Sequence, residues 1–144
     1  MCFPQLSVDV EDIDKAREIA NRLRKDKEFP EIFTFLYVGR LVKHKNVEGL
    51  IEQFNASFKD EAAVLRIIGS GDEEGYLKNK YSSNKVIFIG KKFHRDLVIE
   101  FQHASCFVCP SNFEPWGLVV NEALSASLPV IATKEVGSTF DLIK

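Results

Sequence analysis

Two glutamates, Glu114 and Glu122, have seven residues between them in the stretch PSNFEPWGLVVNEALSASLPVIAT. This stretch predicts a strand end, a polar loop, a short helix that opens at Gly117, and a second strand. The unpaired backbone N–H groups at the start of such a helix favour an anion. Carboxylates would repel an anion, but they accept hydrogen bonds well from sugar and ribose hydroxyls. The stretch therefore predicts a site for an anion and for hydroxyl groups together.

Two cations, Arg40 and Lys45, occur in the polar turn GRLVKHKN that follows an apolar run. A guanidinium fork and an ammonium point charge together suit a diphosphate. A solvated basic turn would be the preferred interpretation of an isolated pair, but the anion-binding helix start at Gly117 favours a functional one. A second basic turn, KKFHR (91–95), either borders a nucleobase or phosphate or is simply solvated.

Three further motifs are better explained by structure than by chemistry. GSGDEEG (69–75) has its third glycine one position late for a dinucleotide fingerprint and carries acids where phosphate would approach, so a tight turn with acidic helix capping is expected. Cys106 and Cys109 lie three apart in a predicted strand, hence on opposite faces, and are expected in the core. The acids of Asp12-Ile13-Asp14 fall in the first turn of a predicted helix, so no metal site is assigned. Trp116 is expected to pack its loop against the domain, and a ligand-facing role is the less favoured alternative.

The elements that must position these residues alternate along the chain. Apolar runs predict strands over 32–39, 62–69, 85–90, 105–110 and 128–133. Helical patterns lie over Asp9–Lys27, 46–56, a short segment after the turn at 70–75, Asp96–His103, the stretch after Gly117, and from Ser138. Alternating strands and helices predict an α/β fold, a doubly wound parallel Rossmann-like sheet with helices on both faces. In such a sheet the loops at the carboxyl ends of the strands bind the ligand.

Length and composition limit the remaining possibilities. A chain of 144 residues accommodates one domain, predicted at 31–144, preceded by an irregular segment and helix at 1–30. The net charge of −2 does not favour nucleic-acid binding. No apolar run approaches the roughly 20 residues that span a bilayer, and the N-terminus lacks the pattern of a secretory signal. With three cysteines, these features lead us to expect a reducing, cytoplasmic location.

Taken together, the motifs resemble the C-terminal, donor-binding domain of GT-B glycosyltransferases of family 4 (glycosyltransferase group 1). The resemblance covers about residues 32–143 and is most specific in E-x7-E within PS-x-x-EP-x-GL-x-x-x-EA. The supporting segments, in the order and spacing of the family, are FLYVGRLVKHKN, LRIIGSGDEEGYL, VIFIG and LPVIATKEVGS.

The resemblance implies a retaining, metal-independent transfer of a sugar from a nucleoside diphosphate, without another cofactor. It implies that Arg40 and Lys45 stabilise the departing diphosphate, that Glu114 lies near the donor sugar, and that Glu122 binds the ribose hydroxyls. The other donor-binding residues that we expect from it are Gly39, Lys91, Ser111, Gly117, Leu118 and Val119.

Several positions depart from the family pattern. Ser127 stands where glycine is usual, so we expect a non-glycine residue in a left-handed conformation. Gly137-Ser138 replaces a glycine pair, and Asp141 replaces a glutamate. A whole enzyme also has an N-terminal Rossmann domain that binds the acceptor and through which it could associate with a membrane surface. We therefore expect this chain to be a fragment or a split subunit that is inactive alone.

Two other functions remain open from the sequence. The chain could be a non-catalytic module that binds a nucleotide sugar, or a partner subunit that kept the fold. A sugar-nucleotide epimerase of related architecture is less favoured, because E-x7-E and GR-x4-K occur here together.

Overall fold

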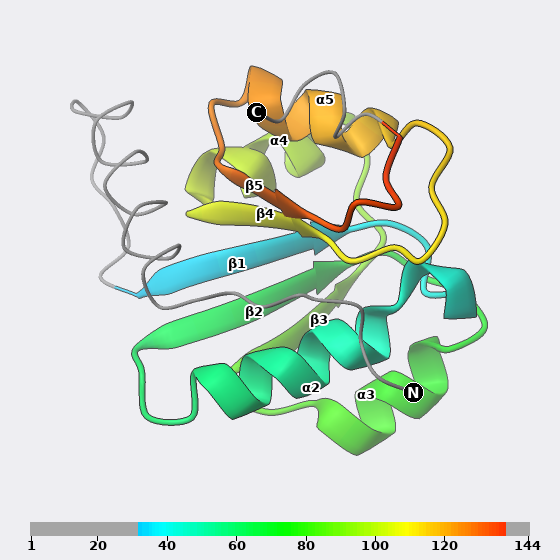
Figure 1. The fold of residues 1–144 in the computed structure, drawn as a ribbon. Helices are drawn as coiled ribbons and strands as arrows, with labels where there is room; N and C mark the ends of the chain where they lie inside the picture. The colour runs from blue at the N-terminus through cyan, green and yellow to red at the C-terminus, as the bar shows by residue number, and fades with distance from the viewer. Residues whose placement is uncertain (1–31, 138–144) are drawn as a thin grey trace.

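The computed structural model describes residues 32–137, which form a five-stranded parallel sheet in the order β3-β2-β1-β4-β5 (Figure 1). The strands are β1 (Phe33–Val38), β2 (Ala63–Ile68), β3 (Val86–Gly90), β4 (Cys106–Cys109) and β5 (Val130–Ala132). All five lie within the predicted apolar runs, and the α/β class with a parallel Rossmann-like sheet is confirmed. The predicted helices at Asp9–Lys27 and from Ser138 fall outside the described residues.

Helices cover both faces of this sheet (Figure 1). One face carries α2 (Val47–Ser57) and α3 (Glu74–Tyr81), and the other carries α4 (His94–His103) and α5 (Leu118–Ser125). A single 3₁₀ turn, η1 (Lys43–Lys45), lies between β1 and α2. The two faces have separate hydrophobic cores, so the sheet divides the described part of the molecule into two apolar layers.

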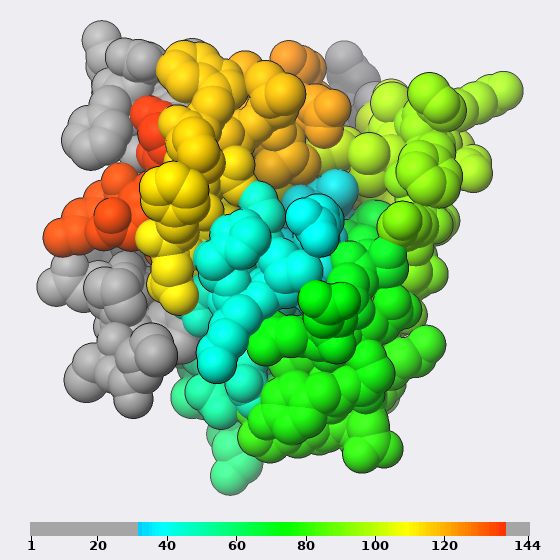
Figure 2. All heavy atoms as spheres, turned by 90° about the vertical axis from the view of Figure 1, so that its right-hand side faces the viewer, coloured from blue at the N-terminus to red at the C-terminus, as the bar shows by residue number. Residues whose placement is uncertain are grey.

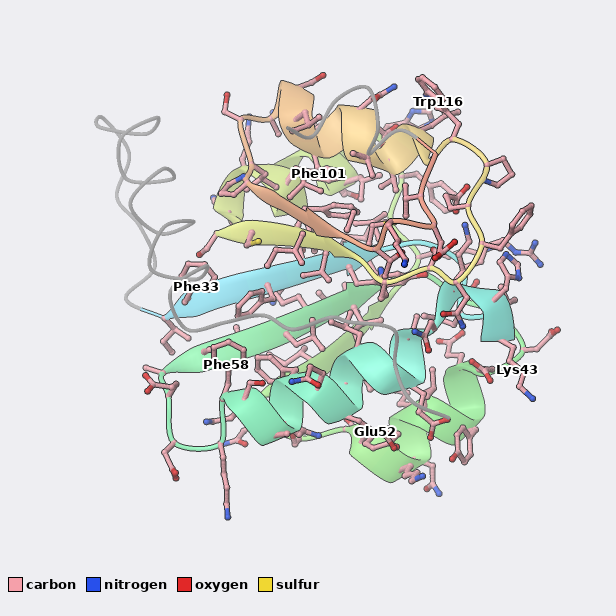
Figure 3. The ribbon with its side chains drawn as sticks, viewed as in Figure 1. Phe33, Lys43, Glu52, Phe58, Phe101 and Trp116 are labelled. Atoms are coloured by element: carbon pink, nitrogen blue, oxygen red, sulfur yellow. The ribbon has the colours of Figure 1, made fainter. Side chains whose placement is uncertain are left out.

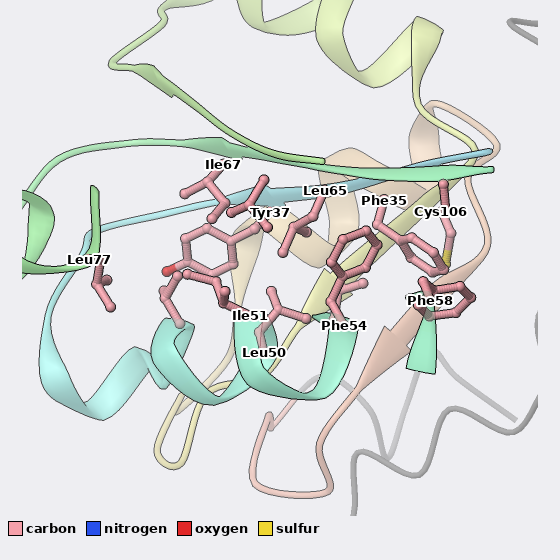
Figure 4. Close-up of a cluster of buried hydrophobic side chains, with 14 of the residues drawn as sticks. Phe35, Tyr37, Leu50, Ile51, Phe54, Phe58, Leu65, Ile67, Leu77 and Cys106 are labelled. Atoms are coloured by element: carbon pink, nitrogen blue, oxygen red, sulfur yellow. The ribbon is translucent and has the colours of Figure 1, made fainter. Parts of the chain in front are cut away.

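The α2 face has an aromatic core (Figure 4). The buried stripe of α2 includes Leu50, Ile51 and Phe54, as its helical periodicity predicts. The ring of Phe54 stacks on Phe58 with centroids 5.4 Å apart, and Phe35 of β1 meets both rings at 5.9 and 5.0 Å. This packing fixes α2 on the sheet and so fixes the turn that leads into it.

The two cysteines of β4 lie on opposite faces, as predicted. Cys106 belongs to the core under α2, whereas Cys109 belongs to the core under α4 and α5. Burial raises the pKa of Cys106 to about 12 and also raises that of Cys109. Both thiols are therefore core groups rather than ligands or nucleophiles.

The segment 69–75 forms a tight turn that leads into α3, as predicted, but its acids do not cap the helix with their side chains. The residue before α3 is Glu73, in a helical conformation without a side-chain capping bond. Gly69 and Gly71 serve a close backbone approach, because a Cβ on either would overlap the backbone of Gly39 or of Leu41. The motif thus joins two loops of the protein.

Candidate active site

The order of the strands reverses beside β1, because β2 and β3 lie on one side of it and β4 and β5 on the other. In a doubly wound sheet this switch point, at the carboxyl ends of the strands, is where ligands bind. The segments that follow β1 and β4 are the turn 39–46 and the loop 110–117. Both carry predicted site residues. Figure 2 views the molecule onto this edge. The turn 39–46 (cyan) lies there between the loop 110–117 (yellow) and the segment around 69–75 (green).

Hydrogen bonds to the backbone of neighbouring loops hold the turn 39–46 from both sides. The amide of Asn112 donates to the carbonyl of His44 at 2.8 Å, and the Asn46 side chain donates to the carbonyl of Pro110 at 3.3 Å. On the other side, Leu41 donates to the Ser70 carbonyl at 2.9 Å and accepts a bond of 2.9 Å from Glu73. The turn therefore has a defined path between its two neighbours.

An ion pair joins Lys45 and Glu114 across the switch point. The two side chains are 20% and 18% exposed, so each is partly shielded from water but still open to the surface. The sequence predicted that both residues lie at this edge. It did not predict that their side chains contact each other. Because an ion pair that is largely shielded from water is less screened than an exposed one, each side chain fixes the direction of the other.

The loop around Glu114 is also fixed through its backbone. The amide of Glu114 donates to the carbonyl of Glu135 at 3.3 Å, and its carbonyl accepts from the amide of Gly137 at 2.9 Å. These bonds form a parallel bridge between Glu114 and Val136. The segment after β5 thus supports the loop after β4 at the residue that carries the site carboxylate.

Helix α5 begins at this loop, as predicted. Gly117 is its N-cap, with φ of 78° in the left-handed region, and Leu118 and Val119 form its first turn. The first amide groups of α5 therefore lie beside the carboxyl end of β4, where an anion would be favoured. Leu118 itself is 70% exposed, so its side chain does not pack into the core.

Glu122 lies one turn further along α5, and its side chain is exposed. It lines a groove of about 750 Å³ between α4 and α5, and His94 at the start of α4 lines the same groove. Asn121 lies beside it, and its Oδ1 atom is buried without a hydrogen-bond partner among the described residues. The groove combines apolar walls with these polar groups, a composition typical of small-molecule sites.

The other predicted residues differ in how far they reach the surface. Arg40 and Lys91 are exposed at the carboxyl edge, and Gly39 is partly buried. Ser111 is 1% exposed, and its hydroxyl lies 3.9 Å from the sulfur of Cys109. The Ser111 carbonyl accepts a hydrogen bond of 2.6 Å from the Thr133 hydroxyl. Ser111 is thus a buried residue that stabilises the loop.

Two aromatic side chains of the loop 110–117 are open to solvent. Phe113 is 66% exposed and Trp116 is 43% exposed. Figure 3 shows Trp116 at the upper right of the molecule, beside the start of α5. The ring of Trp116 thus only partly packs its loop, and the rest of it faces outward.

Tyr37 is a residue of this region that the sequence did not indicate as functional. Its hydroxyl donates a hydrogen bond of 2.8 Å to the carbonyl of Arg40, and the side chain is almost fully buried. Burial, with the nearby Cys109 and Glu114, raises its pKa far above the ordinary value, so the hydroxyl stays protonated as a donor. A tyrosine within the apolar run FLYV is an ordinary core residue by its pattern, and its place two residues before Gly39 was the available signal.

Within residues 32–137, no three His, Cys, Asp or Glu side chains come together as they would to hold a metal ion. In the same part of the chain, no helix is both long enough and apolar enough to cross a bilayer.

Comparisons with known proteins agree with this architecture. The sequence model of the family described as glycosyl transferases group 1 matches residues 17–144. An uncharacterized glycosyltransferase of Methanocaldococcus jannaschii is 35% identical over 113 residues, covering 76% of this chain and 29% of that protein. A glycogen synthase of Mycobacterium tuberculosis is 32% identical over 107 residues, covering 71% and 26%.

Solved structures give the same answer for the fold. A sucrose-phosphate synthase of Thermosynechococcus elongatus is 28% identical with a TM-score of 0.67, over 88% of this chain and 33% of that one. The C-terminal domain of a group 1 family protein from Francisella tularensis is 24% identical with a TM-score of 0.68, over 87% and 69%. Anabaena HepE, in complex with UDP and glucose, has a TM-score of 0.69 at 22% identity, over 88% and 36%.

The chain spans between 22% and 33% of the length of the curated relatives that it matches. Its sheet and helices have the fold of one Rossmann-like half of a GT-B enzyme, and its residues match the family model over most of their length. The chain belongs to the group 1 family of glycosyltransferases.

Proposed function

We propose that this chain is the donor-binding domain of a retaining glycosyltransferase that works without a metal ion. The observation that carries the proposal is the Lys45–Glu114 ion pair at the switch point of the sheet. The donor would be a nucleoside-diphosphate sugar. The acceptor, a glycan, a lipid or another hydroxyl compound, would be held by a second domain, in keeping with the greater length of the relatives.

Each half of the donor would meet groups of the matching chemistry. The diphosphate would lie against Arg40, Lys45 and the first amides of α5 at Gly117, all of which favour negative charge. The ribose hydroxyls would donate to Glu122, whose carboxylate is exposed at the α4–α5 groove. Glu114 would lie at the sugar and keep Lys45 directed toward the phosphates.

The transfer breaks the bond between the anomeric carbon and the diphosphate oxygen, and the electron pair leaves with the diphosphate. The acceptor oxygen bonds to the same carbon from the same face, and its proton passes to the departing oxygen. Charge therefore develops on the diphosphate, where Arg40 and Lys45 would stabilise it. Preorganised cations of this kind contribute roughly 3 kcal/mol to a transition state.

Calorimetric titration of the 144-residue chain with nucleoside diphosphates tests the proposal. UDP is the first ligand to try, because the structurally similar HepE was solved with UDP and glucose. We expect Lys45→Ala to lower the affinity about 10- to 100-fold, because it removes a charge-assisted contact of roughly 1.5–3 kcal/mol. Lys43→Ala is the matched control, since Lys43 is an exposed lysine of the same 3₁₀ turn (Figure 3).

Glu122→Ala separates the two halves of the donor. It should weaken binding of UDP while leaving pyrophosphate binding unchanged, because Glu122 would contact only the ribose. Equal binding of UDP by the unmodified chain and by the Arg40, Lys45 and Glu122 variants would overturn the proposal. A full-length protein that binds the donor but neither transfers nor hydrolyses it would instead favour a non-catalytic nucleotide-sugar module.

A further inference from the structure

A three-residue ionic cluster, Arg66–Glu100–Lys92, lies outside the residues assigned so far. Glu100 of α4 accepts hydrogen bonds from Arg66 of β2, from Nε at 3.0 Å and from Nη2 at 2.9 Å. The ammonium of Lys92 donates to the same carboxylate at 2.9 Å. The Glu100 side chain is 8% exposed, whereas those of Arg66 and Lys92 are 32% and 33% exposed.

The buried carboxylate at the centre of this cluster is charged. Burial raises the pKa of Glu100, but the hydrogen bonds from Arg66 and Lys92 outweigh it and hold the pKa below its ordinary value. A buried charge with two cationic partners is costly to leave unpaired, so the three side chains keep a fixed arrangement. The carboxylate of Glu100 on α4 therefore links strand β2, through Arg66, to the loop after β3, through Lys92.

Lys92 belongs to the loop 91–93, which has no large side chain packed in a core. It joins β3, at the edge of the described sheet, to α4. The residues at its two ends, Gly90 and His94, have φ of 86° and 47° in the left-handed region. Phe93 is 65% exposed, so its side chain does not anchor the loop in a core. Lys92 supplies the ionic contact between this loop and the body of the helix.

The loop ends at the wall of the α4–α5 groove. His94 follows it directly and lines the groove, and Glu122 lines the groove from α5. The phosphate-binding cations would follow β1, which is separated from β3 by β2. Two strand spacings are about 10 Å, the length scale of a nucleoside, so the loop lies where the base of a donor would reach.

We propose that Glu100 is a positioning residue for the nucleoside half of the donor, acting with Arg66 through Lys92 on the loop 91–93. This inference rests on the proposed function of the chain. It assigns Glu100 no contact with the substrate. It makes base recognition depend on an ionic cluster that lies behind the binding surface.

Calorimetry with UDP, ADP, GDP and pyrophosphate tests the inference on the 144-residue chain. In Glu100→Gln and Lys92→Met, the affinity for the preferred nucleoside diphosphate should fall about tenfold, and the preference among the three bases should narrow. Pyrophosphate binding should not change. Lys92→Met tests the same tether without altering a buried charge, in case Glu100→Gln does not fold.

Glu48→Gln is a matched control on the opposite face. The Glu48 carboxylate also accepts three hydrogen bonds, from Tyr76, Lys80 and Tyr81, and joins α2 to α3. This variant should leave every ligand affinity unchanged. A parallel loss of pyrophosphate and nucleotide binding in Glu100→Gln and Lys92→Met would show a general structural role and overturn the inference.

Hydrogen exchange gives a readout that does not need a ligand. In Lys92→Met, the amides of 91–96 should exchange faster while those of 39–46 remain as protected as before. Unchanged exchange over 91–96 would overturn the positioning role, whatever the calorimetry shows. Absence of nucleotide binding by the unmodified chain, with faster exchange in Lys92→Met, would overturn the proposed function and this role in base recognition, and leave the loop tether itself established.

Discussion

The hydroxyl of Tyr37 lies beneath the turn that carries Arg40 and donates a hydrogen bond to the Arg40 carbonyl. A Cβ added to Gly39 would lie 2.7 Å from this hydroxyl oxygen and 3.1 Å from the ring carbon Cζ. The glycine is therefore required by a protein group, Tyr37. The resemblance to the family attributes the same glycine to the donor, and the two explanations can be separated by mutation.

We expect Gly39→Ala to lower the free energy of unfolding by about 1–3 kcal/mol, the usual cost of overpacking. In a Tyr37→Phe background the clash with the hydroxyl is gone, and the cost of Gly39→Ala should be smaller by at least about 0.5 kcal/mol. The relief is partial, because the ring carbon remains. Urea unfolding of the two single variants and the double variant measures this coupling.

Strictly additive effects in that cycle would contradict the role of Tyr37. If Gly39→Ala instead left stability intact and abolished nucleotide binding, the glycine would serve the donor.

Single residues of the site differ in how well the sequence predicts them. Glu114 and Lys45 were predictable because each follows an apolar run in a recognisable turn, and strand ends share one edge. Their ion pair was not, because it depends on the paths of two loops whose residues are 69 positions apart. Glu100 was missed because a glutamate in an amphipathic helix is ordinarily a surface residue.

At the scale of elements, the end of α5 confirms a departure noted in the sequence. Ser127 has φ of 59°, a left-handed conformation that favours glycine. The amide of Leu128 donates to the Ala123 carbonyl at 3.0 Å, and that of Ser127 to the Leu124 carbonyl at 2.9 Å. This pair of bonds is the Schellman motif, which closes a helix and here directs the buried Leu128 toward β5.

Ser127→Gly should raise the free energy of unfolding by about 1 kcal/mol, because glycine adopts the left-handed conformation without the Cβ clash. The control is Ser125→Gly, in the last turn of the same helix, which should lower it by roughly 0.5 kcal/mol. Urea denaturation of both variants gives the two values with opposite signs. A loss of stability in Ser127→Gly would mean that the serine makes a stabilising contact that outweighs its conformation.

Strands were predicted more sharply than helix starts, for a physical reason. The run IFTFLYVG, which contains β1, is bounded by Glu31 and Arg40, so its ends are visible in the sequence. Helix α4 was predicted from Asp96 but begins at His94. An aspartate is favourable both as an N-cap and within the first turn, so its position alone does not define the start. Phe93 occupies the cap position instead, without a side-chain bond.

At the scale of the whole molecule, the sheet separates two cores, and strands β1, β2 and β4 each contribute residues to both. Cys106 lies in one core and Cys109 in the other, on opposite faces of the same strand. The reactivity of each thiol can therefore measure the opening of one core. Both are buried, with exposures of 0% and 3%. Neither can meet a reagent unless the helices on its face move away from β4.

If the two cores form one cooperative unit, both thiols should react with a thiol reagent at the same rate in the native protein. The background is Cys2→Ser, so that Cys106 and Cys109 are the remaining thiols, and single Cys→Ala variants assign each rate. Each rate should be slower than in the urea-unfolded chain by a factor on the order of 10³ or more, the equilibrium constant of unfolding. Both rates should rise together with urea, with the slope expected for exposure of the whole core. Faster and urea-independent labelling of Cys109 would contradict this expectation, because it would mean that α4 and α5 open locally while the aromatic core under α2 stays closed.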